Sequence, residues 1–124
     1  MKVLLINGSP KANGNTSIAL NEMIKVFAEE GVETELIHVG NKDIRGCIAC
    51  GKCFESGKCV FDDDCVNAIA EKVKEADGYV FGSPVYYSHP SGQILSLLDR
   101  LFTIASPYMK YKPGAAIVCA RRAG

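Results

Sequence analysis

The chain has 124 residues, of which 48% are hydrophobic and 23% charged, a composition typical of one globular domain with an apolar core. Basic and acidic residues both number 14, so there is no overall positive field to attract nucleic acid or an anionic membrane. Because no apolar run reaches a membrane span of roughly 20 residues or forms a secretory signal, we expect a cytoplasmic protein whose six cysteines are thiols or metal ligands rather than disulfides.

The hydrophobic pattern predicts strands and helices in alternation along the chain. The expected strands are 2–7, 32–39, 79–82 and 115–120, and the expected helices are 16–30, one that Asp63 or Asp64 would cap, and one marked by Ile94, Leu98 and Leu101. This order predicts an α/β fold: a doubly wound parallel sheet forming a single domain over 1–124, with an irregular cysteine-rich segment at about 40–62. Ligands of such folds bind at the carboxyl ends of the strands.

The loop after the first strand, GSPKANGNTS (8–17), has the composition of an anion site at a helix N-terminus. It lacks the glycine spacing of a dinucleotide-binding loop and the Gly-Lys-Ser/Thr of a P-loop. Free backbone N–H groups with hydroxyl and amide side chains suit a phosphate monoester. No cysteine nucleophile or following arginine is present to attack a phosphate. The alternative is a polar turn with an ordinary helix cap.

A second loop, GSPVYYSHPSGQ (82–93), follows the third predicted strand. Tyr86 and Tyr87 could present flat faces to a planar ring, while the backbone of Val85 could bond the edge of that ring. The alternative is an aromatic loop that packs on its own domain or on another subunit. A phosphate site and an aromatic platform at neighbouring strand ends together suggest FMN.

The sequence resembles the flavodoxin-like NAD(P)H-dependent FMN reductases in GSPKANGNTS, in ADGYVFGSPVYYSHPSG (76–92) and in Leu98-Asp99-Arg100. The resemblance implies FMN contacts from two loops and an approach by the segment 120–124. The residues implied are Ser9, Lys11, Asn13, Asn15, Thr16, Ser17, Pro84, Val85, Tyr86, Tyr87, Ala120 and Arg121. It further implies a homodimer or homotetramer and a structural role for Arg100. Members of this family usually continue with another strand and a last helix, so strand 115–120 would be an uncovered edge.

The cysteine-rich segment resembles the iron–sulfur flavoprotein branch of the same family. Cys47, Cys50, Cys53 and Cys59 are spaced C-x2-C-x2-C-x5-C, and the resemblance implies a 4Fe-4S cluster on them. Zinc on four thiolates and a set of reduced thiols without metal are the alternatives. We expect Cys65 and Cys119 to be packing residues.

Two histidines and three aspartates could imitate functional groups. We expect His38 to be structural, His89 to lie near the flavin without acting as an acid or base, and Asp62–Asp64 to cap a helix. Hydride transfer to a flavin requires no protein nucleophile, so no catalytic residue is predicted.

The resulting hypothesis is an FMN-dependent oxidoreductase that takes hydride from NAD(P)H and reduces a quinone, a flavin or another small acceptor. One alternative is an iron–sulfur flavoprotein that carries electrons to or from a ferredoxin-like protein. Another is a zinc- or flavin-sensing module without turnover.

Overall fold

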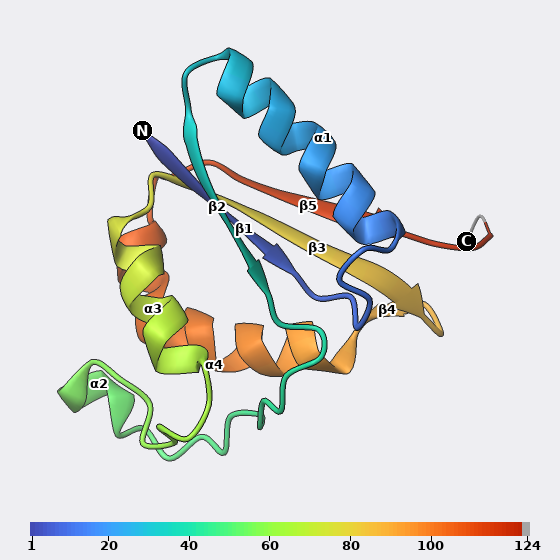
Figure 1. Ribbon diagram of the computed structural model, residues 1–124. Coiled ribbons are helices and arrows are strands. Elements are labelled where there is room, and N and C mark those ends of the chain that lie inside the picture. The colour runs from blue at the N-terminus through green and yellow to red at the C-terminus, as the bar shows by residue number, and fades with distance from the viewer. Residues whose placement is uncertain (123–124) are drawn as a thin grey trace.

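The structure, a computed structural model, describes residues 1–122 and contains a parallel sheet with helices on both faces (Figure 1). The elements in chain order are β1 (Lys2–Asn7), α1 (Asn15–Glu29), β2 (Glu33–His38), α2 (Cys53–Ser56), α3 (Val66–Glu75), β3 (Gly78–Tyr86), β4 (His89–Pro90), α4 (Gly92–Met109) and β5 (Gly114–Cys119). The predicted α/β class and the order of the main elements are therefore confirmed. Within the described residues, none of the helices is both long and apolar enough to cross a bilayer.

The four longer strands lie in the order β2-β1-β3-β5, and all of their pairings are parallel. Figure 1 shows α1 on one face of this sheet and α3 and α4 on the other. Along β1, Val3 and Leu5 pack with the α1 layer, whereas Leu4 and Ile6 pack with the α3–α4 layer. Successive side chains of a strand point to opposite faces, which explains why the first strand is apolar at every position from Val3 to Ile6.

The segment 83–90 differs from the predicted loop. Strand β3 continues to Tyr86 and forms a hairpin with β4, in which Val85 pairs with Pro90 and Tyr86 with His89. The two turn residues, Tyr87 and Ser88, both have positive φ angles, 46° and 67°, as a two-residue type I′ turn requires. The prediction of a loop was wrong because Ser83-Pro84 looks like a strand terminator, whereas both residues remain paired with β5, Ser83 with Val118 and Pro84 with Cys119.

Strand β5 is an uncovered edge, as we expected, and its apolar sequence does not lie in the interior. It pairs with β3 alone among the described strands, and Ala115, Ala116 and Val118 are exposed. The side chain of Ile117 packs against the α1 layer and is partly buried. An apolar strand is thus open to solvent along the edge of the sheet in this chain.

Candidate functional site

The β1–α1 loop is held rigidly at the carboxyl end of the sheet. The side chain of Asn7 accepts the N–H of Ser9 at 2.9 Å, and the hydroxyl of Ser9 accepts the N–H of Lys11 at 3.2 Å. The Nε2 of His38, at the end of β2, lies 2.6 Å from the carbonyl oxygen of Ser9. Since His38 contacts backbone in this way, its placement agrees with the structural role that we expected.

A glycine after β2 is required by the close approach of this loop. A Cβ atom built on Gly40 would lie 1.9 Å from the carbonyl oxygen of Ser9, a separation that no side chain tolerates. The N–H of Gly40 donates to the carbonyl of Asn7 at 3.2 Å. The backbone at Gly40 therefore packs directly against the loop, in addition to the side-chain contact of His38.

The N-terminus of α1 has free donors that face this loop. Gly14 is the N-cap residue and supplies no side chain to cap the helix, and the first turn contains no acidic residue. The first backbone N–H groups of a helix have no partner within the helix and lie at its positive end. By contrast, the N-cap of α4 is occupied: Ser91 accepts the N–H of Ile94 at 3.3 Å. The α1 terminus can therefore accept an anion from outside the chain.

Three loops that are far apart in the sequence meet beside this helix end. A cleft of about 340 Å³ is lined by residues from the β1–α1 loop, the end of β3 and the end of β5, namely Ser9, Pro10, Lys11, Gly14, Asn15, Thr16, Pro84, Tyr86, Cys119, Ala120 and Arg121. Two of these residues, Lys11 and Arg121, are cations, and none of the lining residues is acidic. The cleft therefore suits an anionic ligand that reaches from one loop to another.

Eight of the twelve predicted FMN contacts line this cleft, and four lie elsewhere. Ser17 is buried in α1, where its hydroxyl accepts from the side chain of Asn21 at 3.2 Å. Tyr87 lies at the hairpin turn and is 99% exposed, whereas Asn13 is exposed and Val85 is partly buried outside the cleft lining.

Cys119, which we expected to be a packing residue only, also lines the cleft. The available signal was its position as the last residue of β5, at the end of the sheet where ligands bind. Cys65 fulfils the packing role expected of it, because it is packed against the core and burial raises the pKa of its thiol.

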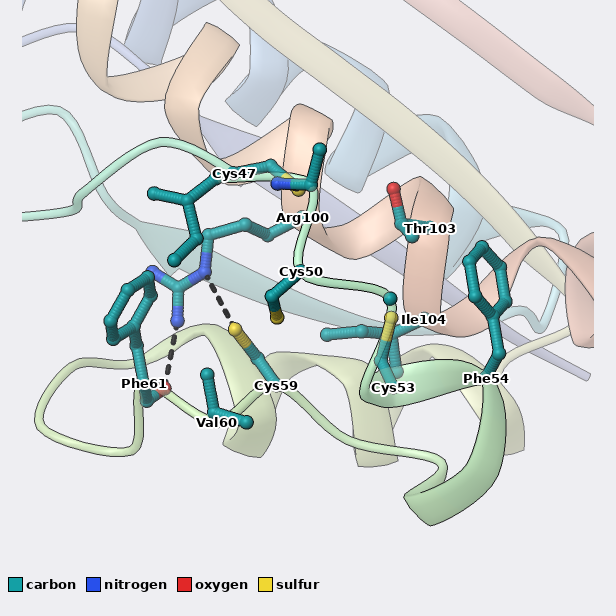
Figure 2. A pocket seen from close by; sticks show the side chains of 13 residues that line it. Cys47, Cys50, Cys53, Phe54, Cys59, Val60, Phe61, Arg100, Thr103 and Ile104 are labelled. Carbon is teal, nitrogen blue, oxygen red and sulfur yellow. Dashed lines mark hydrogen bonds between the residues drawn. The ribbon is translucent and has the colours of Figure 1, made fainter.

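A second cavity brings together the four cysteines of the cysteine-rich segment. Its volume is about 210 Å³, and Cys47, Cys50, Cys53 and Cys59 all line it together with Phe54, Phe61 and Arg100 (Figure 2). The positive φ angles of Ala49 (56°) and Gly51 (74°) curl the loop, and the N–H of Ala49 donates to the sulfur of Cys47 at 3.3 Å. This cavity shares no lining residue with the cleft.

The thiols of this cysteine cavity are unpaired and could bind a metal group. All four cysteines are free thiols, and no three His, Cys, Asp or Glu side chains in residues 1–122 are positioned to bind one metal ion. A four-iron cluster is larger than an ion, so its cysteines surround a volume instead of converging on a point. Four thiols around one cavity are a donor set that a four-iron cluster uses, and zinc uses the same kind of ligand.

Arg100 lines the cysteine cavity and is paired in the interior with Asp64. Their side chains are 1% and 6% exposed and form an ion pair. Burial alone would raise the pKa of Asp64, but the hydrogen bonds from Arg100 and from the N–H of Val66 hold this pKa below its ordinary value. Asp64 thus contacts the first turn of α3, as expected of a capping aspartate, but it also pairs with α4, which the sequence analysis did not foresee.

Comparisons with known proteins identify the family. The family model of the NADPH-dependent FMN reductases matches residues 1–124. The chain belongs to this family. An iron–sulfur flavoprotein of Methanocaldococcus jannaschii is 48% identical over 100 residues, which cover 81% of this chain and 51% of that protein. An iron–sulfur flavoprotein of Archaeoglobus fulgidus is 36% identical over 119 residues, which cover 95% of this chain and 54% of that protein.

The fold is shared with solved structures of more distant sequence. A structure of RosB with bound 8-demethyl-8-formylriboflavin-5'-phosphate superposes with a TM-score of 0.76 at 19% identity, covering 100% of this chain and 54% of that one. An NADH:FMN oxidoreductase in its apo form superposes with a TM-score of 0.68 at 20% identity, covering 98% and 59%. The flavodoxin-like fold is therefore confirmed, and the chain spans about half the length of the curated relatives that it matches.

Proposed function

We propose that the chain carries the flavin site of an FMN-dependent oxidoreductase. The observation that supports this most strongly is the meeting of three strand-end loops at one cleft that has a free helix N-terminus, two cations and no acidic residue in its lining. A phosphate group bound there would accept from the first N–H groups of α1 and from Asn15 and Thr16. When bound, FMN supplies hydride acceptance and one-electron transfer.

The protein's own residues would position the flavin ring. Tyr86 lines the cleft and is 43% exposed, and Pro84, on the same strand, is the last β3 residue paired with β5. Ser83 and Ser91 fix that strand end, because the N–H of Ser91 donates to the hydroxyl of Ser83 at 2.9 Å and the hydroxyl of Ser91 donates to the carbonyl of Gly8 at 2.6 Å. The end of β3, which would contact the flavin ring, and the β1–α1 loop, which would bind the phosphate, are thus connected by hydrogen bonds before any ligand binds.

We also propose that the cysteine cavity holds a 4Fe-4S cluster, which would make the complete protein an iron–sulfur flavoprotein. Two observations support this: the four thiols surround one cavity, and the relatives at 48% and 36% identity are named iron–sulfur flavoproteins. The cluster would supply one-electron transfer, and the four thiolates would be its ligands. Such a protein would exchange electrons with a ferredoxin-like partner, as a cytoplasmic homodimer or homotetramer.

The second candidate is a reductase that takes hydride from NAD(P)H and reduces a small acceptor such as a quinone or free flavin. Its support is the family itself, the NADPH-dependent FMN reductases. This activity requires the cleft but not the cysteine cavity. The two candidates therefore differ in whether the four cysteines are needed for turnover.

One experiment separates these candidates. The protein is purified without oxygen, and its visible spectrum, iron and labile sulfide are measured. Flavin bands with about four iron and four sulfide per chain support the iron–sulfur flavoprotein. Bleaching of the flavin bands by reduced ferredoxin, but not by NADPH or NADH, supports its role as an electron carrier. Flavin bands without iron, bleached by NADPH or NADH, support the second candidate. A colourless protein that contains zinc, with no affinity for added FMN, contradicts both.

A further inference from the structure

The four cysteines of the cavity are held to very different degrees. Cys47 and Cys50 are exposed on an irregular loop, whereas the backbone of Cys59 is fixed on both sides by Asn67 of α3. The N–H of Cys59 donates to Oδ1 of Asn67 at 2.8 Å, and Nδ2 of Asn67 donates back to the carbonyl of Cys59 at 2.9 Å. Cys59 is therefore in position before any cluster forms.

The sulfur of Cys59 is contacted by Arg100 of α4. The Nε–H of Arg100 donates to Sγ of Cys59 at 3.3 Å (Figure 2). The other four N–H groups donate to the carbonyl of Arg45 at 3.0 Å, to the carbonyl of Phe61 at 2.8 Å and to the two carboxylate oxygens of Asp64. A guanidinium has five N–H donors in one rigid plane, so every donor is engaged and Nε–H cannot rotate away from the sulfur.

We propose that Arg100 is a positioning residue for Cys59 that raises the reduction potential of the cluster on these cysteines. This inference rests on the proposed cluster. Reduction places one more electron on the cluster and increases the negative charge on its sulfurs. An N–H donor aimed at one sulfur therefore stabilises the reduced state more than the oxidised state. Because Arg100 is 1% exposed, water screens this interaction little.

The effect comes from the direction of the N–H group rather than from net charge. Asp64 pairs with Arg100, so the two charges largely cancel at a distance. A lysine at position 100 would keep the positive charge but would lack the planar guanidinium group, whose other hydrogen bonds hold Nε–H against the sulfur of Cys59. Arg100→Lys therefore separates the directed hydrogen bond from the charge.

The test is a redox titration of the reconstituted cluster, followed by electron paramagnetic resonance, in the wild type and in Arg100→Lys. We expect the equilibrium constant for cluster reduction to fall about tenfold in the variant, which is about 59 mV toward more negative potential for a one-electron couple. The matched control is Lys112→Met. Lys112 donates to the carbonyl of Lys74 in the last turn of α3 at 3.3 Å and to that of Ala76 just beyond it at 2.6 Å, so its loss removes a charge and an α3 contact without touching Cys59. We expect no shift of potential in this control.

A measurement on the wild type alone covers the case in which Arg100→Lys fails to fold. With ¹⁵N-labelled arginine, pulsed resonance spectra of the reduced cluster are expected to show coupling to a guanidinium nitrogen. Absence of this coupling, or equal potentials in the wild type and Arg100→Lys, would overturn the inference while the cluster itself stands. A wild-type protein that takes up no four-iron cluster would overturn the proposed cluster and this inference together.

Discussion

Arg100 of α4 and Asp64, two residues before α3, are paired in the interior, where their side chains are 1% and 6% exposed. This pair joins the two helices that cover one face of the sheet to the cysteine-rich segment. Removing one partner of a buried pair leaves an uncompensated charge. The structural importance of the pair therefore exceeds that of any surface ion pair in the described residues.

We predict that Asp64→Ala lowers the free energy of unfolding by about 3–5 kcal/mol, measured by urea denaturation of the metal-free chain. The control is Glu22→Ala, which removes the exposed pair with Lys25, whose two side chains are 64% and 67% exposed. This control should cost less than about 1 kcal/mol. Similar losses in the two variants would show that the interior pair does not stabilise the fold.

The same pair predicts a dependence on pH. Because the pKa of Asp64 is lower in the folded chain than its ordinary value, the unfolded chain binds this proton more readily. The stabilisation is present above the unfolded pKa of about 3.9 and is lost as the pH falls through the folded pKa. The difference in unfolding free energy between the wild type and Asp64→Ala should therefore shrink in acid. A difference that stays constant from pH 7 down to about pH 3 would contradict the assignment.

Gly40→Ala tests the support of the β1–α1 loop. Its Cβ would overlap the carbonyl oxygen of Ser9, so the loop or β2 must move, and we expect a loss of roughly 1–3 kcal/mol of stability together with weaker FMN binding. Gly46→Ala is the matched control, because no atom lies within 4 Å of the added Cβ. Thermal unfolding and fluorescence titration with FMN measure the two effects. Wild-type behaviour of Gly40→Ala would refute the close approach.

The proposed phosphate site at the N-terminus of α1 is tested by the combined substitution Asn15→Ala and Thr16→Ala. Loss of two charge-assisted hydrogen bonds should weaken FMN binding by about 3 kcal/mol, or somewhat more than 100-fold. Lys25→Ala serves as the control, since Lys25 is exposed in the C-terminal half of the same helix and its ion pair with Glu22 lies on the surface. Calorimetric titration gives both affinities. Equal affinities would remove the α1 terminus from the site.

The hairpin turn offers a prediction in the stabilising direction. Tyr87 and Ser88 both adopt positive φ angles, which cost non-glycine residues energy. Replacing them by Asn and Gly, the residues that type I′ turns prefer, should raise the unfolding free energy by about 1 kcal/mol. Because Tyr87 is 99% exposed, the change removes little packing. A lower melting temperature would contradict the turn, and weaker FMN binding at unchanged stability would place Tyr87 at the ring.

The sequence alone determined the fold class and the region of the site. Apolar runs such as Val3–Ile6 and the helical spacing of Ile94, Leu98 and Leu101 report burial on both faces of a sheet and on one face of a helix. Loops that follow parallel strands must meet at one edge, so the convergence of Ser9, Pro84 and Ala120 on one cleft could be anticipated.

Only the tertiary structure decided which side chains reach their targets. Ser17 and Thr16 are adjacent in sequence, yet Ser17 contacts Asn21 and only Thr16 lines the cleft. Arg100 and Cys59 are separated by 41 residues, and no local pattern predicts their contact. Local periodicity records whether a position is buried, but the partner of a buried polar group depends on how separate elements pack. That packing is a property of the folded chain as a whole.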